Sequence, residues 1–181
     1  MDPCRADIQT RRICSMQAYD FVHLSLYALG GVRKDVLQAR TYFVGHLMSQ
    51  DLYFQPTFYE PYSSAVACAV DRLIDLRFAK CTGDALRLTP AGKVMACAKV
   101  CGSSEFLNKL LNVKDAVKNA GRMDVESLKV AAKIHQRIGD VKVAMDGLYE
   151  ITHAFGWRVP EAQTRKAAKF LNNLELMTVT K

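Results

Sequence analysis

The sequence predicts a mainly α-helical protein that carries small β-hairpin wings and is built as two units in tandem. Three observations support this fold class. Apolar residues recur three and four positions apart through most of the chain, which is typical of amphipathic helices. A tight turn at 81–84 separates two short stretches with a strand pattern. A helix precedes this hairpin and another follows it, an order that is characteristic of a winged helix-turn-helix.

Size and composition indicate a globular protein. With 181 residues, of which 50% are hydrophobic and 24% charged, the chain is long enough for one domain or two small ones. No stretch approaches the roughly 18 apolar residues of a membrane-spanning helix. The N-terminal stretch lacks the apolar core of a signal peptide. We therefore expect a cytoplasmic protein that makes no contact with a membrane.

Neither the cysteines nor the histidines have the spacing of metal ligands. The six cysteines include no CxxC pair, which fits reduced thiols. Cys97 and Cys101 lie one helical turn apart and could share a metal ion, but buried cysteine commonly serves as a small apolar residue. The histidines are scattered along the chain, at His23, His46, His135 and His153. We expect neither a metal nor a cofactor.

Two helices open the first unit. The stretch 15–29 is apolar on nearly all sides, which predicts a central helix that Gly30 ends. The stretch 33–48 predicts a second helix. Arg33 and Lys34 stand at its start, where free backbone amides favour anions, so they are either phosphate ligands or solvated charges. The buried stripe of this helix is expected at Val36, Ala39 or Arg40, Phe43 and Leu47.

An aromatic segment, 49–62, follows these helices. It is far longer than the three or four residues that join the helices of a helix-turn-helix motif, and it contains Pro56 and Pro61. Its aromatic side chains either cover the core as an extended lid or form a patch that binds a protein partner. The candidate partner-binding residues are Tyr53, Phe58, Tyr59 and Tyr62.

A third helix follows the aromatic segment. Ser63 or Ser64 can cap it, because a serine oxygen accepts a hydrogen bond from a free amide of the first turn. Its buried face repeats at helical spacing, at Val66, Ala69, Val70, Leu73 and Leu76.

The predicted hairpin comes next. Its first strand runs over 76–80, the turn contains Gly83, and the returning strand runs over 85–88. Thr89 can cap the helix that follows, and Pro90 occupies the first helical position, where its missing amide costs nothing.

Residues 18–92 resemble the winged-helix domains of the YwgA and Panacea-antitoxin kind. The segments VLQARTYFVGHL, FYEPYSS, AVDRLIDLRF and LTPAG match that family's motifs in order and spacing. Glu60 and Arg77 stand where the family has glycine. The resemblance implies a prokaryotic DNA-binding regulator or an antitoxin-associated module, without catalytic residues.

The second half of the chain predicts a connecting helix over 103–123 and a helix-turn-helix-like unit over 124–181, behind an N-terminal winged-helix domain over 1–102. Asp124 can cap the first helix of this unit. Further helices are expected over 143–155 and 160–173, and a strand over 174–180. This order partly repeats that of the first unit.

The helix at 160–173 has the better pattern for contacting DNA. Its inward positions are Thr164, Ala167, Ala168, Leu171 and Leu174. Lysine, glutamine and asparagine side chains can pair with bases or phosphates, although a solvated helix face would have a similar composition. The candidate DNA-binding residues in this region are Arg158, Gln163, Arg165, Lys166, Lys169 and Asn173.

The third helix of the first unit is less suited to DNA, because it carries Asp71 and Asp75. Around the predicted wing, Arg77, Lys80 and Arg87 could hold phosphate.

These patterns favour a DNA-binding transcriptional regulator. The net charge of +7 fits a double-stranded DNA partner, and a homodimer would match a two-fold operator. The alternative is a non-catalytic protein-interaction module, such as an antitoxin-like partner of a toxin. The sequence contains no paired carboxylates, Cys/His dyad or glycine-rich phosphate loop, so we do not expect an enzyme.

Overall fold

The computed structural model describes residues 17–57, 59–101, 104–119 and 123–180. Within these residues the protein is mainly helical, with 65% helix in eight helices. A three-stranded antiparallel sheet and a separate parallel pair of strands complete the fold. In the described ranges, the helices are all too short or too polar to cross a membrane.

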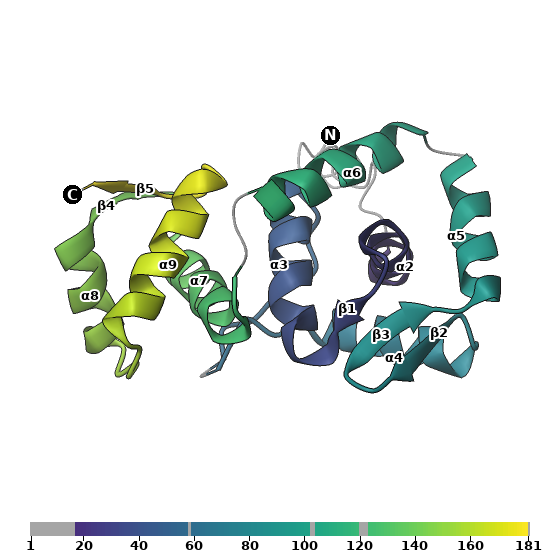
Figure 1. Cartoon of the computed structure of the whole chain (residues 1–181), viewed down its shortest axis with the longest axis horizontal. Coiled ribbons are helices and arrows are strands. Elements are labelled where there is room, and N and C mark those ends of the chain that lie inside the picture. The colour runs from purple at the N-terminus through teal and green to yellow at the C-terminus, as the bar shows by residue number, and fades with distance from the viewer. Residues whose placement is uncertain (1–16, 58, 102–103, 120–122, 181) are drawn as a thin grey trace, which may run out of the picture.

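The first unit alternates helices with the strands of one small sheet (Figure 1). The strand order is β1-β3-β2, with β2 and β3 forming the hairpin and β1 pairing with β3. The elements are α2 (Ala18–Leu29), β1 (Val32–Arg33), the 3-10 helix η2 (Lys34–Val36), α3 (Leu37–Leu47), α4 (Ser64–Asp75), β2 (Ala79–Thr82), β3 (Ala85–Leu88), α5 (Pro90–Cys101) and α6 (Ser104–Asn119).

The second unit is built differently at its end. Its strands pair in parallel, so within 123–180 the structure has no second hairpin of the kind expected. The strand β4 also takes the start of the segment that was predicted as helix 143–155. The elements are α7 (Val125–Ile138), β4 (Lys142–Ala144), α8 (Met145–Ala154), α9 (Glu161–Asn173) and β5 (Thr178–Thr180).

Local signals place the hairpin and its flanking helices. Ser63 Oγ accepts a hydrogen bond from the Val66 amide at 3.2 Å, and Thr89 Oγ1 accepts one from the Gly92 amide at 3.1 Å, so both predicted caps are confirmed. The first strand begins at Ala79, later than predicted. Arg77 adopts a left-handed backbone with φ of 58°, which ends α4 and turns the chain into β2.

The start of the second predicted helix is wrong. Val32 and Arg33 pair with β3, and a 3-10 turn precedes α3, so Arg33 and Lys34 do not lie at an α-helix N-terminus. This strand depends on a partner about fifty residues later in the chain, with Val32 opposite Leu86, which local periodicity does not reveal.

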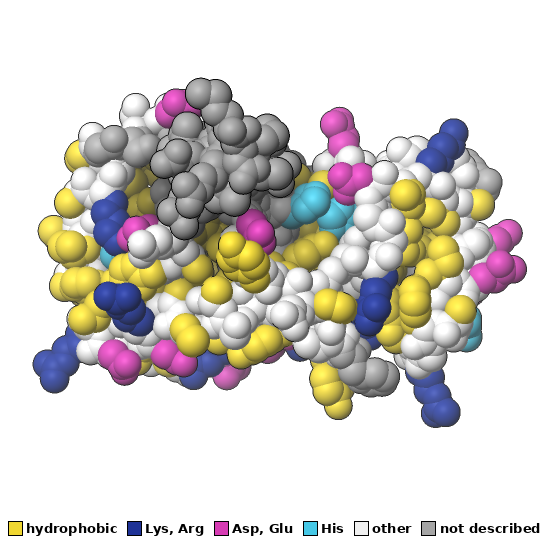
Figure 2. Space-filling model, turned by 180° about the vertical axis from the view of Figure 1, so that it is seen from behind, with side chains coloured by type: hydrophobic (Ala, Val, Ile, Leu, Met, Phe, Trp, Pro, Cys, Tyr) yellow, Lys and Arg dark blue, Asp and Glu magenta, His cyan; other side chains and the backbone are white. Residues whose placement is uncertain are grey.

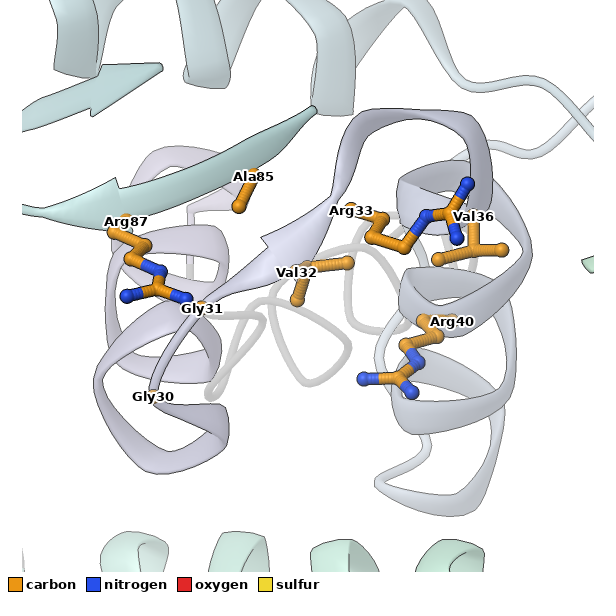
Figure 3. Close-up of a pocket in the computed structure, with 8 residues that line it drawn as sticks. All are labelled: Gly30, Gly31, Val32, Arg33, Val36, Arg40, Ala85 and Arg87. Atoms are coloured by element: carbon orange, nitrogen blue, oxygen red, sulfur yellow. The ribbon is translucent and has the colours of Figure 1, made fainter. Parts of the chain in front are cut away.

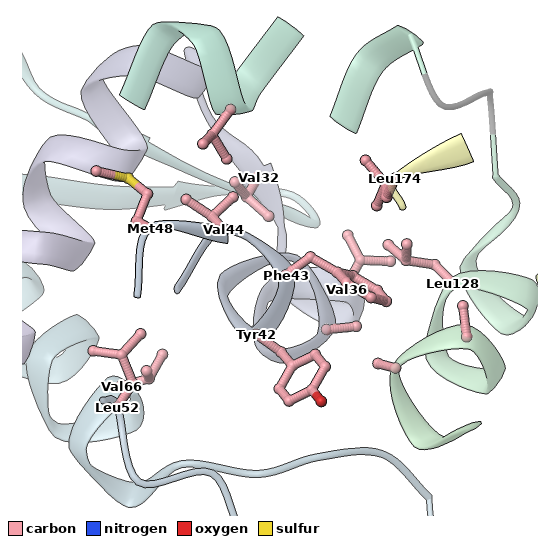
Figure 4. Close-up of a cluster of buried hydrophobic side chains, with 14 of the residues drawn as sticks. Val32, Val36, Tyr42, Phe43, Val44, Met48, Leu52, Val66, Leu128 and Leu174 are labelled. Atoms are coloured by element: carbon pink, nitrogen blue, oxygen red, sulfur yellow. The ribbon is translucent and has the colours of Figure 1, made fainter. Parts of the chain in front are cut away.

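The helix α3 lies at the centre of a core shared by both units (Figure 1). Val44 and Met48 pack on the side of the first unit, whereas Phe43 and Val36 face Leu128 and Leu174 of the second (Figure 4). The Phe43 ring is fully buried, and its centroid lies 5.2 Å from that of the Phe170 ring of α9. The two units therefore have one continuous core.

The predicted connecting helix also contributes to this core. The helix α6 packs against α2, α3 and α5. Its Leu110 is 1% exposed, and its Phe106 ring meets the Phe21 ring of α2 edge to face at 6.4 Å. The connecting helix thus packs as part of the first unit.

We predict that Gly92→Ala strongly destabilises the protein. A Cβ at Gly92 would lie 2.0 Å from the Phe78 carbonyl oxygen, so α5 would have to move away from the α4–β2 connection. We expect the free energy of unfolding to fall by about 3 kcal/mol in urea denaturation followed by circular dichroism.

The matched control is Gly147→Ala in α8, where the new Cβ would be 3.7 Å from Val143 Cγ1. This change should stabilise the protein by up to about 1 kcal/mol, because alanine favours a helix over glycine. Equal effects of the two substitutions would contradict the close packing of α5 at Gly92.

Candidate functional site

Alternation along the three-stranded sheet separates an apolar face from a basic one. Val32, Leu86 and Leu88 are buried. On the outer face, Lys80 of β2 lies directly opposite Arg87 of β3, and both are exposed. Because side chains opposite each other on one face are neighbours, the hairpin brings two of the predicted phosphate ligands together.

A pocket of about 190 Å³ lies beside this outer face. Arg40 of α3 and Arg87 of β3 approach it from either side of the Gly31–Val32 segment (Figure 3). Gly31 makes room for this arrangement, because a Cβ there would lie 2.8 Å from Arg87 Cγ. Gly31 also has a φ of 124°, which disfavours other residues. The lining residues are Gly30, Gly31, Val32, Arg33, Val36, Arg40, Ala85 and Arg87.

The cations around this pocket differ in whether they already have a partner. The Arg33 guanidinium donates to both carboxylate oxygens of Asp35, at 3.1 and 2.7 Å. Among the residues that the structure describes, Arg40, Lys80 and Arg87 form no ion pair. We call these three residues the basic sheet face. They can bind an anion without first breaking an ion pair.

The helix α4 has the acidic exposed side that the sequence indicated. Asp71 and Asp75 are exposed, and so is Ile74. The Arg72 guanidinium lies over the Tyr19 ring, 5.1 Å from its centroid. Arg77 is exposed at the end of this helix. Carboxylates on α4 would repel phosphates, so the basic sheet face is the more favourable anion site of the first unit.

The buried side of α9 agrees with the prediction, but its outer side is divided. The five positions expected inward are all buried. Phe170 is also buried, at 2% exposed, and it lies between Gln163 and Lys166 on the helix surface. Gln163 is half-buried, whereas Lys169 and Asn173 are exposed. Gln163 is therefore separated from the exposed part of the stripe.

Two cations of α9 already have carboxylate partners. Arg165 donates to Glu161 at 2.7 Å, and Lys166 donates to Asp124 at 3.1 Å. Lys169 forms no ion pair with the described residues. The stripe predicted to bind DNA therefore offers less unpaired positive charge than its composition indicated.

The aromatic segment is a loop that leaves its tyrosines outside the core. Backbone hydrogen bonds of 2.8 and 2.9 Å between Gln55 and Tyr62 close the loop. Tyr53 is 72% exposed, Tyr59 78% and Tyr62 45%. Only Phe54, of the aromatic residues described here, packs inward, edge to face with Tyr42. Phe58 lies outside the described residues. The interpretation of this segment as a lid is wrong for the three tyrosines.

One pocket brings residues of both predicted sites together. It has a volume of about 420 Å³ and lies between the aromatic loop and the second unit. Tyr59, a predicted partner-binding residue, lines it with Arg158 and Gln163, which were predicted to bind DNA. The Lys133 ammonium lies 4.2 Å from the centre of the Trp157 ring in its wall. Residues predicted to bind a protein partner and residues predicted to bind DNA thus line the same pocket.

A cluster of two histidines, one tyrosine and one aspartate lies where the two units meet. The spacing of these residues in the sequence did not reveal it. His135 of α7 is 2% exposed on its side chain, and its Nε2 donates to Asp140 Oδ1 at 2.6 Å. His46 Nε2 of α3 lies 3.7 Å from the same oxygen. With Nε2 as donor, His135 Nδ1 accepts from the Tyr42 hydroxyl at 2.7 Å. We call these four residues the junction cluster.

Burial shifts the pKa values of two members of this cluster, His135 and Tyr42. Desolvation lowers the pKa of His135, although the hydrogen bond to Asp140 partly opposes this effect. Burial likewise raises the pKa of Tyr42, so its hydroxyl stays protonated. His135 is therefore neutral at pH 7, and its one ring lone pair, on Nδ1, accepts the hydrogen bond from Tyr42.

Comparison of the chain with protein-family models, curated proteins and solved structures finds no match.

We predict that Asp124→Ala destabilises the protein by about 1 kcal/mol at pH 7, because it removes the cap of α7. The Ser127 amide and hydroxyl, with Lys166, lower the pKa of Asp124 from 3.8 to about 2. The stabilisation from this carboxylate is therefore complete above about pH 4 and is lost as the pH falls toward 2. Urea unfolding of wild type and variant across this range should show the difference shrinking.

Lys166→Ala separates the cap from the exposed ion pair. It leaves the Asp124 to Ser127 bonds in place and should cost well under 1 kcal/mol. A difference between wild type and Asp124→Ala that is independent of pH would contradict the role of the ionised cap.

Proposed function

We propose that the protein is a winged-helix DNA-binding protein that regulates transcription and contacts double-stranded DNA through the basic sheet face. The observation that carries this proposal is that Lys80 and Arg87 lie opposite each other on the outer face of a sheet with the order β1-β3-β2, beside the pocket that Arg40 of α3 and Arg87 line. The element order α2-β1-α3-α4-β2-β3-α5 supports the proposal, because it matches the order expected of a winged helix in which β2 and β3 would form the wing.

The chemistry of these side chains favours the DNA backbone over base edges. A guanidinium presents several donors in a plane and binds phosphate oxygens in pairs. Asp71 and Asp75 on α4 make that helix a poor reader of the electronegative major groove. The proposed contact is thus mainly with phosphates, which position a protein on the duplex without reading its sequence.

The helix α9 is proposed as a second, weaker contact. Lys169 and Asn173 are exposed on it, whereas Arg165 and Lys166 would have to leave their carboxylate partners. The free thiols of Cys68, Cys81, Cys97 and Cys101 fit the cytoplasmic location that this role requires. The proposed role involves no catalysis.

The test is fluorescence anisotropy with a random duplex across a salt series. Affinity should fall with rising salt, because phosphate contacts release counterions. In Lys80→Ala/Arg87→Ala the salt slope should decrease by about 2, because two phosphates are no longer neutralised by the protein. In Lys166→Ala/Lys169→Ala the decrease should be about 1 or less, because Lys166 is paired with Asp124.

The charge-matched control is Lys93→Ala/Lys109→Ala, which removes two exposed lysines from α5 and α6. This variant should keep the wild-type slope. Absence of binding at low salt and micromolar protein, or an equal decrease in slope in all three double variants, would contradict a contact through the basic sheet face.

The exposure of the loop tyrosines supports a second candidate, a non-catalytic protein-interaction module. Tyrosine combines an apolar ring with a polar tip and is enriched at interfaces. A second copy of the chain is the partner that can be tested directly. Sedimentation velocity should then show a concentration-dependent dimer.

Tyr53→Asn/Tyr62→Ala should weaken that dimer without changing DNA binding. Asparagine is chosen because Tyr53 has a φ of 53°, which asparagine tolerates. A dimer unaffected by these changes, or a monomer at all concentrations, would exclude self-association through the loop.

A further inference from the structure

The junction cluster has the donor set of a transition-metal site. His46, His135 and Asp140 each offer one ligand atom, and these three atoms lie within 4.8 Å of one another. The Nε2 to Oδ1 distances of 2.6 and 3.7 Å bracket the spacing of ligands about 2.0–2.2 Å from one ion in a tetrahedral site. Histidine and acidic side chains meet at the surface where the two units join (Figure 2).

Backbone geometry explains how the three groups converge. Tyr42 and His46 are four residues apart on α3 and therefore share the face that meets α7. His135 comes from the last turn of α7, and Gly139 ends that helix with a φ of 75°. This left-handed turn brings the Asp140 carboxylate back to the His135 ring.

The surroundings of His135 match those of a metal-binding histidine. Such a histidine usually has a hydrogen-bond partner on its other ring nitrogen, which fixes the orientation of the ring. Here that partner is the Tyr42 hydroxyl, 2.7 Å from Nδ1. A hydroxyl both donates and accepts, so the Tyr42 oxygen can accept a hydrogen bond from Nδ1–H when Nε2 binds an ion.

We propose that His46, His135 and Asp140 bind one divalent transition-metal ion of the Zn²⁺ class at the junction of the two units. Two imidazoles and one carboxylate suit Zn²⁺, Co²⁺ or Ni²⁺, whereas Mg²⁺ and Ca²⁺ prefer oxygen ligands. His46 and Asp140 are 40% and 63% exposed on their side chains, which gives the ion a path from solvent and leaves a position for water. The ion would clamp α3 to α7.

The proposal is independent of DNA binding and is tested on the full chain with Co²⁺ and Zn²⁺. The exposed Cys97 and Cys101 on α5 could bind metal themselves, so the experiment uses a Cys97→Ser/Cys101→Ser background. Co²⁺ titration followed by visible absorption should show one ion per chain. Saturating Zn²⁺ should raise the thermal midpoint, because the ion binds the folded state.

Variants identify the ligands. His46→Ala and Asp140→Asn change exposed side chains, and each should lower the affinity by at least roughly tenfold and abolish the shift in midpoint. Tyr42→Phe keeps the ring but removes the hydroxyl, and should lower the affinity by roughly tenfold. The matched control is His153→Ala, an exposed histidine on α8 outside the cluster, which should bind as the background does.

Two results would overturn the proposal. One is an affinity that is unchanged in both His46→Ala and Asp140→Asn. The other is absence of binding in the Cys97→Ser/Cys101→Ser background, which would assign any ion bound by the wild type to the α5 thiols.

Discussion

The contact between the Phe43 ring of α3 and the Phe170 ring of α9 joins the two halves of the molecule in one core. The helix α3 is buried against its own unit on one side and against α7 and α9 on the other. Its side chains must therefore pack well against both units at once. Ala39 and Phe43 are fully buried in this helix. A helix enclosed in this way cannot shift without disturbing both units, because protein interiors are close-packed.

This constraint explains which elements can be predicted from the sequence. The helix α4, the turn at Gly83 and the caps at Ser63 and Thr89 depend on residues within a few positions of each other, and all were predicted. The strand β1 and the parallel β4–β5 pair depend on distant partners, and local patterns missed them. The helix α6 shows a third case, because a helix was predicted there, whereas the surface that it covers depends on tertiary packing.

The candidate sites follow the same division. Lys80 and Arg87 were predicted as cations around the wing, and the pairing of β2 with β3 places them opposite each other. The buried stripe of α3 was predicted to include Ala39 or Arg40. Ala39 is the buried one, whereas Arg40 is half-buried at the rim of a pocket, which only the position of β3 defines. The junction cluster joins Tyr42 to His135, 93 positions later in the chain, and such a pair has no signature in sequence spacing. Charge composition likewise did not reveal that Arg165 and Lys166 are paired.

The helix α3 also provides a physical connection between the basic sheet face and the junction. The Arg40 side chain extends from this helix toward the pocket, and the side chains of Tyr42 and His46 extend toward α7. Because a helix of three turns moves as a rigid body, any rearrangement at the junction that displaces α3 also displaces the Arg40 guanidinium. Coupling between two sites requires an element whose position both of them influence. Here α3 carries residues of both the pocket and the junction cluster, so coupling between them would act through this one helix.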